Sequence, residues 1–256
     1  MELAVSTLFC LHKPLEEALA DLLPLETVNI ELVDAGPHAL NGERVRMLLE
    51  LKDSRGLDYS IHAPYADMNP AADDSHMREA VLRRLETTMK WASQLEARAV
   101  VFHPGNSTAM ERVDPGMAWR LNLEAVRRVL EIAERLGVQA LIENVPEPFP
   151  FVMKSADDFS RFFDELGADA GMVLDVAHAN IRCETQEFIR RFSSRSRHVH
   201  VSDNQGDLDT HLPIGDGAID WDGTMRALKG VGYDGWVTIE SYSGVAESLN
   251  LLEGLL

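Results

Sequence analysis

Residues 140–178, ALIENVPEPFPFVMKSADDFSRFFDELGADAGMVLDVAH, contain the repeating unit from which the fold can be deduced. Two short apolar runs, 140–143 and 171–175, have the length and composition of buried parallel strands. Between them, Ser155 is followed by two aspartates and by apolar residues at helical spacing, and Gly167 stands where such a helix should end. The segment therefore predicts a strand, a helix and a second strand, which is the βαβ unit of a parallel sheet.

The same alternation runs along the whole chain, with eight strand candidates and eight helix candidates. The strand candidates are residues 3–7, 28–33, 59–63, 99–103, 140–143, 171–175, 198–202 and 236–240. The helix candidates lie near 14–23, 41–53, 75–96, 114–136, 155–166, 184–193, 221–229 and 245–253. Asn41, Ser75 and Asp114 are further signals for helix starts, and Gly137 is one for a helix end. Because no Pro-, Gly- or Ser-rich linker divides the chain, we expect one α/β domain over residues 1–256, a single (β/α)8 TIM barrel.

The composition excludes several classes of protein. A chain of 256 residues with 45% hydrophobic and 26% charged residues is neither disordered nor collagen-like nor a small disulfide scaffold. Its two cysteines, Cys10 and Cys183, have no metal-binding or redox spacing. A net charge of −18 disfavours attraction to nucleic acid. The first residues show neither a basic region nor an apolar run of membrane-spanning length, so we expect a cytoplasmic protein without a membrane partner.

Metal-competent side chains gather at the predicted carboxyl ends of the strands, where TIM barrels carry their chemistry. One His there is usually a hydrogen-bonded loop residue, and one Asp is often a helix cap. Here there are nine such side chains: His62, His103, Glu143, Asp175, His178, His200, Asp209, His211 and Glu240. Burying so many carboxylates beside imidazoles without a cation would be very costly. The set therefore predicts a divalent metal site.

The donor types limit the choice of metal. Imidazoles and carboxylates without thiolates suit zinc or manganese, with cobalt or magnesium as alternatives, and one to three ions are expected. His198 and His200 lie two apart on a strand and so face the same side of the sheet, with His200 nearer the end. We therefore expect His200 to be the ligand and His198 to pack one layer below as an orienting group. Glu31, at the end of another strand, is either a proton carrier or a partner in a salt bridge.

These residues resemble the xylose isomerase-like TIM-barrel superfamily, which contains sugar isomerases and epimerases and the endonuclease IV family. The resemblance covers nearly the whole chain. It is carried by FHPG (102–105), IEN (142–144), the D-x-x-H of 175–178, HVHVSDN (198–204), the D-x-H of 209–211, LPIGDG (212–217) and the glutamate of TIES (238–241). Their order is that of the metal ligands in endonuclease IV.

The resemblance implies three metal positions. They would be formed by His62, His103 and Glu143, by Glu143, Asp175, His200 and Glu240, and by His178, Asp209 and His211. Isomerases and epimerases of the superfamily need only the second position, where Glu143 and Glu240 would act as base and acid. One segment departs from the nuclease pattern, because His-Asp-Ser-Tyr is replaced by His62-Ala63-Pro64-Tyr65 and only the tyrosine is kept.

Three functions follow as hypotheses. The favoured one is a metal-dependent isomerase or epimerase for a small carbohydrate or polyol, with Glu31, Tyr65 and His198 as further candidates for substrate contact. The first alternative is an endonuclease IV-like trinuclear zinc phosphodiesterase acting on abasic DNA. Only Lys13, Lys154 and Arg182 follow predicted strands, too few to track a duplex, so nucleic acid is not the expected partner. The second alternative is a barrel that binds metal and a metabolite without catalysis.

Overall fold

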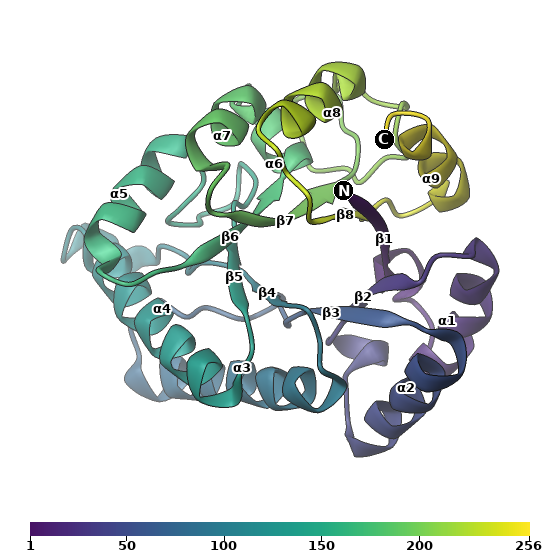
Figure 1. Ribbon diagram of the computed structural model, residues 1–256. Helices are drawn as coiled ribbons and strands as arrows, with labels where there is room; N and C mark the ends of the chain where they lie inside the picture. The colour runs from purple at the N-terminus through teal and green to yellow at the C-terminus, as the bar shows by residue number, and fades with distance from the viewer.

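The computed structural model describes residues 1–256, and its backbone forms a closed barrel of eight parallel strands in the order β1 to β8. Figure 1 shows the strands at the centre and the helices around them. This architecture confirms the predicted (β/α)8 TIM barrel. No helix is both long enough and apolar enough to cross a lipid bilayer.

Strands and helices alternate along the chain, except that two helices lie between β6 and β7. The strands are β1 (Glu2–Ser6), β2 (Asn29–Val33), β3 (Asp58–His62), β4 (Val100–Phe102), β5 (Ala140–Glu143), β6 (Gly171–Asp175), β7 (Ser196–Val201) and β8 (Trp236–Ile239). The α-helices are α1 (Leu15–Leu22), α2 (Gly42–Arg55), α3 (Ser75–Leu95), α4 (Met117–Leu136), α5 (Ala156–Leu166), α6 (Val176–Ile181), α7 (Thr185–Phe192), α8 (Trp221–Gly230) and α9 (Val245–Glu253). Short 3-10 helices occur at η1 (Thr7–Cys10), η2 (Leu23–Leu25), η3 (Gly36–His38) and η4 (Ala109–Arg112). All eight predicted strands and eight predicted helices are present within a few residues of the expected ends.

Three local features differ from the expected elements. Helix α6 has no predicted counterpart, because six residues are too few to show a helical period. The N-cap of α3 is Asp74 rather than Ser75, and its carboxylate accepts the N–H groups of the next turn. Helix α4 begins at Met117, three residues after Asp114. Gly116, just before it, has a left-handed conformation (φ +83°), which cannot be part of a right-handed helix.

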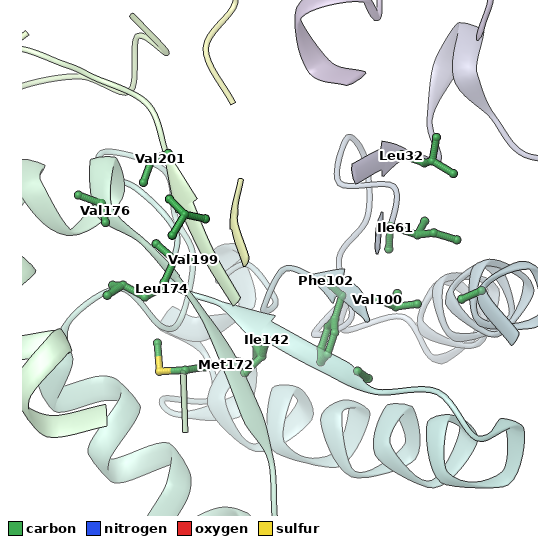
Figure 2. Close-up of a cluster of buried hydrophobic side chains, with 14 of the residues drawn as sticks. Leu32, Ile61, Val100, Phe102, Ile142, Met172, Leu174, Val176, Val199 and Val201 are labelled. Atoms are coloured by element: carbon green, nitrogen blue, oxygen red, sulfur yellow. The ribbon is translucent and has the colours of Figure 1, made fainter. Parts of the chain in front are cut away.

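Side chains alternate along each strand between the helices and the barrel interior. The outward side chains form the main apolar core against the helices, and Figure 2 shows members of it from β2 to β7, among them Leu32, Phe102 and Val199. A separate group of four small apolar side chains, Ala99, Val101, Leu141 and Val173, packs together away from that core. The remaining inward positions are largely polar, and Glu31, Ser60, His198 and Thr238 are all buried there. The barrel interior is thus polar below the ends of its strands.

The loops after β3 and β4 pack tightly against each other at Gly105. A Cβ atom at Gly105 would lie 2.3 Å from Cβ of Ala71 and 2.8 Å from its backbone nitrogen. The N–H of Gly105 donates to Oδ1 of Asn122 on α4 at 2.8 Å. The glycine of the FHPG segment is therefore required for the close approach of the two loops next to the predicted ligands His62 and His103.

We expect Gly105→Ala to lower the free energy of unfolding by about 1–3 kcal/mol, because the added methyl must displace the backbone at Ala71. The matched control is Gly42→Ala, whose added Cβ meets no atom within 4 Å. That control should change stability by no more than about 0.5 kcal/mol. Urea unfolding of the three proteins measures the difference, and equal stability of both variants would contradict the packing argument.

Candidate active site

The predicted metal ligands lie together at the carboxyl ends of the strands. Most of them line a cavity of about 360 Å³, and the two that do not, Asp175 and His200, are fully buried. Two larger surface hollows, of about 720 and 520 Å³, are lined by the opposite ends of the strands and contain no histidine. The chemistry-bearing side chains are therefore concentrated at the end of the barrel that the sequence predicts.

The nine side chains form three groups whose donor atoms lie within 4.8 Å of one another. The groups are His62, His103 and Glu143; Glu143, Asp175, His200 and Glu240; and His178, Asp209 and His211. They coincide with the three positions that the resemblance implies. The structure thus brings all nine residues together, while their role as metal ligands stays a prediction.

Glu143, at the end of β5, joins two of these groups. Its Oε2 lies 3.2 Å from Nε2 of His62 and 3.1 Å from Nε2 of His103. Its Oε1 lies 3.2 Å from Nδ1 of His200. Burial alone would raise the pKa of this carboxyl, but the imidazoles of His200 and His103 outweigh it and hold the pKa well below its usual range. Glu143 is therefore an ionised carboxylate at the centre of the cluster.

Three histidines at the ends of the strands are oriented by backbone carbonyl groups. Nδ1 of His62 donates to the carbonyl of Ala63, Nδ1 of His178 to that of Asn144, and Nδ1 of His211 to that of Glu240, each at 2.7 Å. Because a carbonyl can only accept, the proton must sit on Nδ1 of each ring. Nε2 is then the atom that each ring directs at a carboxylate of the cluster. This arrangement fixes a metal-binding tautomer.

The two oxygens of Asp175 have different environments. Oδ1 caps helix α6 by accepting the backbone N–H of His178 at 2.7 Å. Oδ2 is buried and has no hydrogen-bond partner, and the same is true of Oδ1 of Asp209. Burial raises the pKa of Asp175 to about 7. Unpartnered carboxylate oxygens surrounded by imidazoles fit a divalent cation of the zinc or manganese type, because such an ion would replace the missing hydrogen bonds.

The loop after β7 is held by Asp203, a residue that sequence reasoning did not single out. Its buried carboxylate accepts from Nε1 of Trp221 (2.8 Å) and the N–H of Gly215 (2.9 Å), and its backbone pairs with Leu212. This clamp supports His211, which adopts φ +46°, a left-handed conformation that is uncommon outside glycine. Asn144 has a similar role, because its side chain exchanges two hydrogen bonds with the backbone of Asp175. The only sequence signal for either residue was its place in the SDN and IEN segments.

The rest of the cavity is apolar and uncharged. Its upper wall consists of Leu8, Val33, Tyr65, Ala66, Pro146, Phe149, Phe151 and Tyr242. No Lys or Arg lines it. The three cations expected near the strand ends form ion pairs, Lys13 with Asp21, Lys154 with Glu147, and Arg182 with Glu147 and Glu184. The site therefore offers no free cation to a phosphate.

The remaining candidates for substrate contact fall into two positions. Tyr65 is partly exposed at the cavity and packs edge-on against His62, with ring centroids 5.5 Å apart. Glu31 and His198 are buried and do not line the cavity, and Nε2 of His198 lies 3.0 Å from Oε2 of Glu31. Only Tyr65 of these three can reach a ligand in the cavity.

Comparison with known proteins identifies the family of the chain. The family model described as xylose isomerase-like TIM barrel matches residues 23–255. Fructoselysine 3-epimerase from Escherichia coli O157:H7 is 22% identical over 242 residues, which cover 90% of this chain and 87% of that protein. The crystal structure of a D-tagatose 3-epimerase-like protein has a TM-score of 0.93 at 26% identity and covers 100% of this chain and 97% of its own. The IOLI protein with a bound zinc atom shares the fold, with a TM-score of 0.81 at 18% identity and coverage of 100% and 96%.

We expect metal binding to release protons at neutral pH. Burial disfavours charged imidazoles, but Asp175 and Asp209 outweigh it and raise the pKa of His178 to about 10, and Asp209 raises that of His211 to about 9. Both rings are therefore protonated on both nitrogens at pH 7, and a metal must displace the proton on Nε2. The affinity should rise by up to about tenfold per pH unit for each proton released, and should level off above these pKa values.

Calorimetric titration with Zn²⁺ in buffers of different ionisation enthalpy, between about pH 6 and 8, counts the protons released. The His178→Ala/His211→Ala double variant is the control, because it lacks both rings and should release fewer protons. An affinity that does not change with pH would contradict the expected protonation of the two rings.

Proposed function

Since the chain belongs to the xylose isomerase-like TIM-barrel family, we propose that it is a divalent-metal-dependent isomerase or epimerase of a small, unphosphorylated sugar or related polyol. Sugar 3-epimerases among the similar proteins support this reaction class. The observation that carries the proposal is the pairing of Glu143 and Glu240. An oxygen of each carboxylate lies 3.2 Å from the same atom, Nδ1 of His200.

The two carboxylates suit proton transfer at a carbon next to a carbonyl group. One carboxylate takes the proton, the electron pair of the broken C–H bond moves toward the carbonyl oxygen, and an enediolate forms. In epimerisation the other group, as a carboxylic acid, returns a proton to the opposite face of that carbon. In isomerisation the proton goes to the neighbouring carbon, and the hydroxyl proton of the first carbon moves to the former carbonyl oxygen. Epimerisation requires a base and an acid on opposite faces of that carbon, whereas isomerisation can use one group on one face.

The origin of Glu143 and Glu240 in separate strands supports their assignment to the two faces of the carbon. Glu143 ends β5 and Glu240 follows β8, with β6 and β7 between them in the barrel. Glu143, Asp175, His200 and Glu240 would hold the metal, and the carboxylates of Glu143 and Glu240 would exchange protons with the substrate. A divalent cation at these residues would supply positive charge that acidifies the carbon-bound proton.

The cavity supports a small substrate without phosphate. Its volume of about 360 Å³ is at the lower end of the range for small-molecule sites. A phosphate group would find no Lys or Arg side chain on its walls. The aromatic rings of Tyr65, Phe149 and Tyr242 would instead pack against the apolar faces of a compact neutral molecule.

The phosphodiesterase remains a second candidate because of one observation. His178, Asp209 and His211 form a complete third donor group that the proton-transfer reaction does not use. Three cations acting together are suited to phosphodiester hydrolysis, since they can activate water and stabilise the leaving oxygen. Against this candidate stand the neutral cavity walls and the net charge of −18.

We expect Glu143→Gln and Glu240→Gln each to lower turnover by about 10²–10⁴-fold, because each removes a proton-transfer group. The assay incubates a panel of unphosphorylated ketoses in D₂O and follows deuterium uptake at the exchanging carbon by NMR. The matched control is Glu147→Gln, which alters a glutamate in the loop after β5 that does not line the cavity and whose partners are Lys154 and Arg182. Activity near that of the wild type in either test variant would show that the acid–base assignment is wrong.

Wild-type protein should bind one more equivalent of zinc than the His178→Ala/His211→Ala variant, because one remaining carboxylate cannot hold an ion. The variant should keep most of its ketose turnover, since Glu143, Glu240 and their metal group are intact. Cleavage of abasic duplex DNA should be weak or absent in both proteins. Efficient cleavage by the wild type that disappears in the variant would replace the isomerase with the phosphodiesterase.

A further inference from the structure

His200 is oriented in the opposite sense to the three histidines whose rings are anchored by carbonyl groups. It directs Nδ1 at the cluster, 3.2 Å from Oε1 of Glu143 and 3.2 Å from Oε2 of Glu240. Its Nε2 points into the barrel, where strand carbonyls are used by the parallel ladder and cannot orient the ring. A ring that binds a metal through Nδ1 must keep its proton on Nε2. His200 therefore needs a side-chain acceptor inside the barrel.

Glu31 on β2 provides the only such acceptor. Its Oε1 lies 3.0 Å from Nε2 of His200. Both atoms are buried, and neither makes a hydrogen bond of good geometry, to the other or to a third group. Each is thus the one polar partner available to the other. A small rotation of the ring would align the N–H with the carboxylate oxygen.

The other oxygen of Glu31 is held in place by neighbouring strands. Oε2 accepts the hydroxyl of Ser60 at 2.9 Å, and Ser60 is paired with Glu31 in the β2–β3 register. The same oxygen lies 3.0 Å from Nε2 of His198, which is also 2.8 Å from Oγ1 of Thr238. These contacts fix the carboxylate in one orientation. Glu31 is fully buried and does not line the cavity, so it is built into the barrel and not available to a substrate.

We propose that Glu31 is a positioning residue that keeps the proton of His200 on Nε2 and so presents Nδ1 to the metal. This role rests on the metal-dependent function proposed above. A carboxylate behind a ligating imidazole fixes the tautomer and increases the basicity of the ring. Glu31 would thereby contribute to metal affinity without contact to the metal or the substrate. His198, Ser60 and Thr238 would act one step further away, by holding Glu31.

The test compares zinc binding by the wild type, Glu31→Leu and Glu31→Gln. Glu31→Leu removes the acceptor and should raise the zinc dissociation constant about 100-fold, and Glu31→Gln keeps a neutral acceptor and should raise it about tenfold. Competition with a chelator of known affinity measures both constants. Thermal melts of the metal-free proteins report whether each variant folds, and the glutamine variant preserves the shape of the side chain if leucine is not tolerated.

A spectroscopic readout separates positioning from general stabilisation. The readout is the NMR spectrum of zinc-bound protein labelled with ¹⁵N-histidine. In the wild type, the His200 ring should have its proton on Nε2 and the metal on Nδ1. The signal of the hydrogen-bonded Nε2 proton should be lost in Glu31→Leu. The signal is assigned by its absence in His200→Gln. The matched control is Asp34→Asn. The Asp34 carboxylate lies just after β2, is as buried as that of Glu31, and accepts hydrogen bonds from Arg84, Thr88 and the N–H of Leu40. That control should lower stability and leave zinc affinity unchanged.

The outcomes distinguish this role from the proposed function. Equal zinc affinity in wild type and Glu31→Leu, or a wild-type His200 ring with its proton on Nδ1, would overturn the positioning role of Glu31 alone. A wild-type protein that binds no zinc would overturn both the positioning role and the metal-dependent function. Reduced affinity together with the loss of the Nε2 proton signal would support the proposal.

Discussion

A closed parallel barrel leaves almost no free backbone hydrogen-bonding groups in its interior, and the arrangement of the site depends on this constraint. Polar side chains that point inward must bond to one another. Glu31, Ser60, His198 and Thr238 do so in the middle of the barrel. Four carboxylates and five imidazoles do so at the strand ends. The interior is therefore organised as a polar network whose members orient each other.

The constraint is relaxed where the strands end. There the backbone turns away from the ladder, and carbonyl groups of Ala63, Asn144 and Glu240 become available to histidine rings. His200 lies within β7 and has no such carbonyl, so a carboxylate takes this role. Both arrangements hold imidazoles in the orientation that a metal requires before any ligand arrives, which reduces the cost of forming the site.

The distribution of charge supports the proposed binding of small neutral molecules. Acidic groups and imidazoles form the floor of the cavity, aromatic side chains form its walls, and nearby cations are paired with surface carboxylates. Such a cavity can bind a cation at its floor and a compact neutral molecule above it. It lacks the row of free Lys and Arg side chains on which binding of a nucleic-acid backbone depends.

The sequence by itself determined the barrel and the positions of the nine predicted ligands. The spacing of apolar residues that marks a strand or a helix is a local property of the sequence. Because the carboxyl ends of parallel strands lie at the same end of a barrel, residues such as His62 and Glu240 could be assigned to one region from the sequence alone. Only the tertiary structure decided which nitrogen of each histidine faces the cluster, which oxygen of Asp175 caps α6, and that Glu31 contacts His200. These features depend on the stagger of the strands and on side-chain rotamers, which join residues far apart in the chain and leave no periodic trace in the sequence.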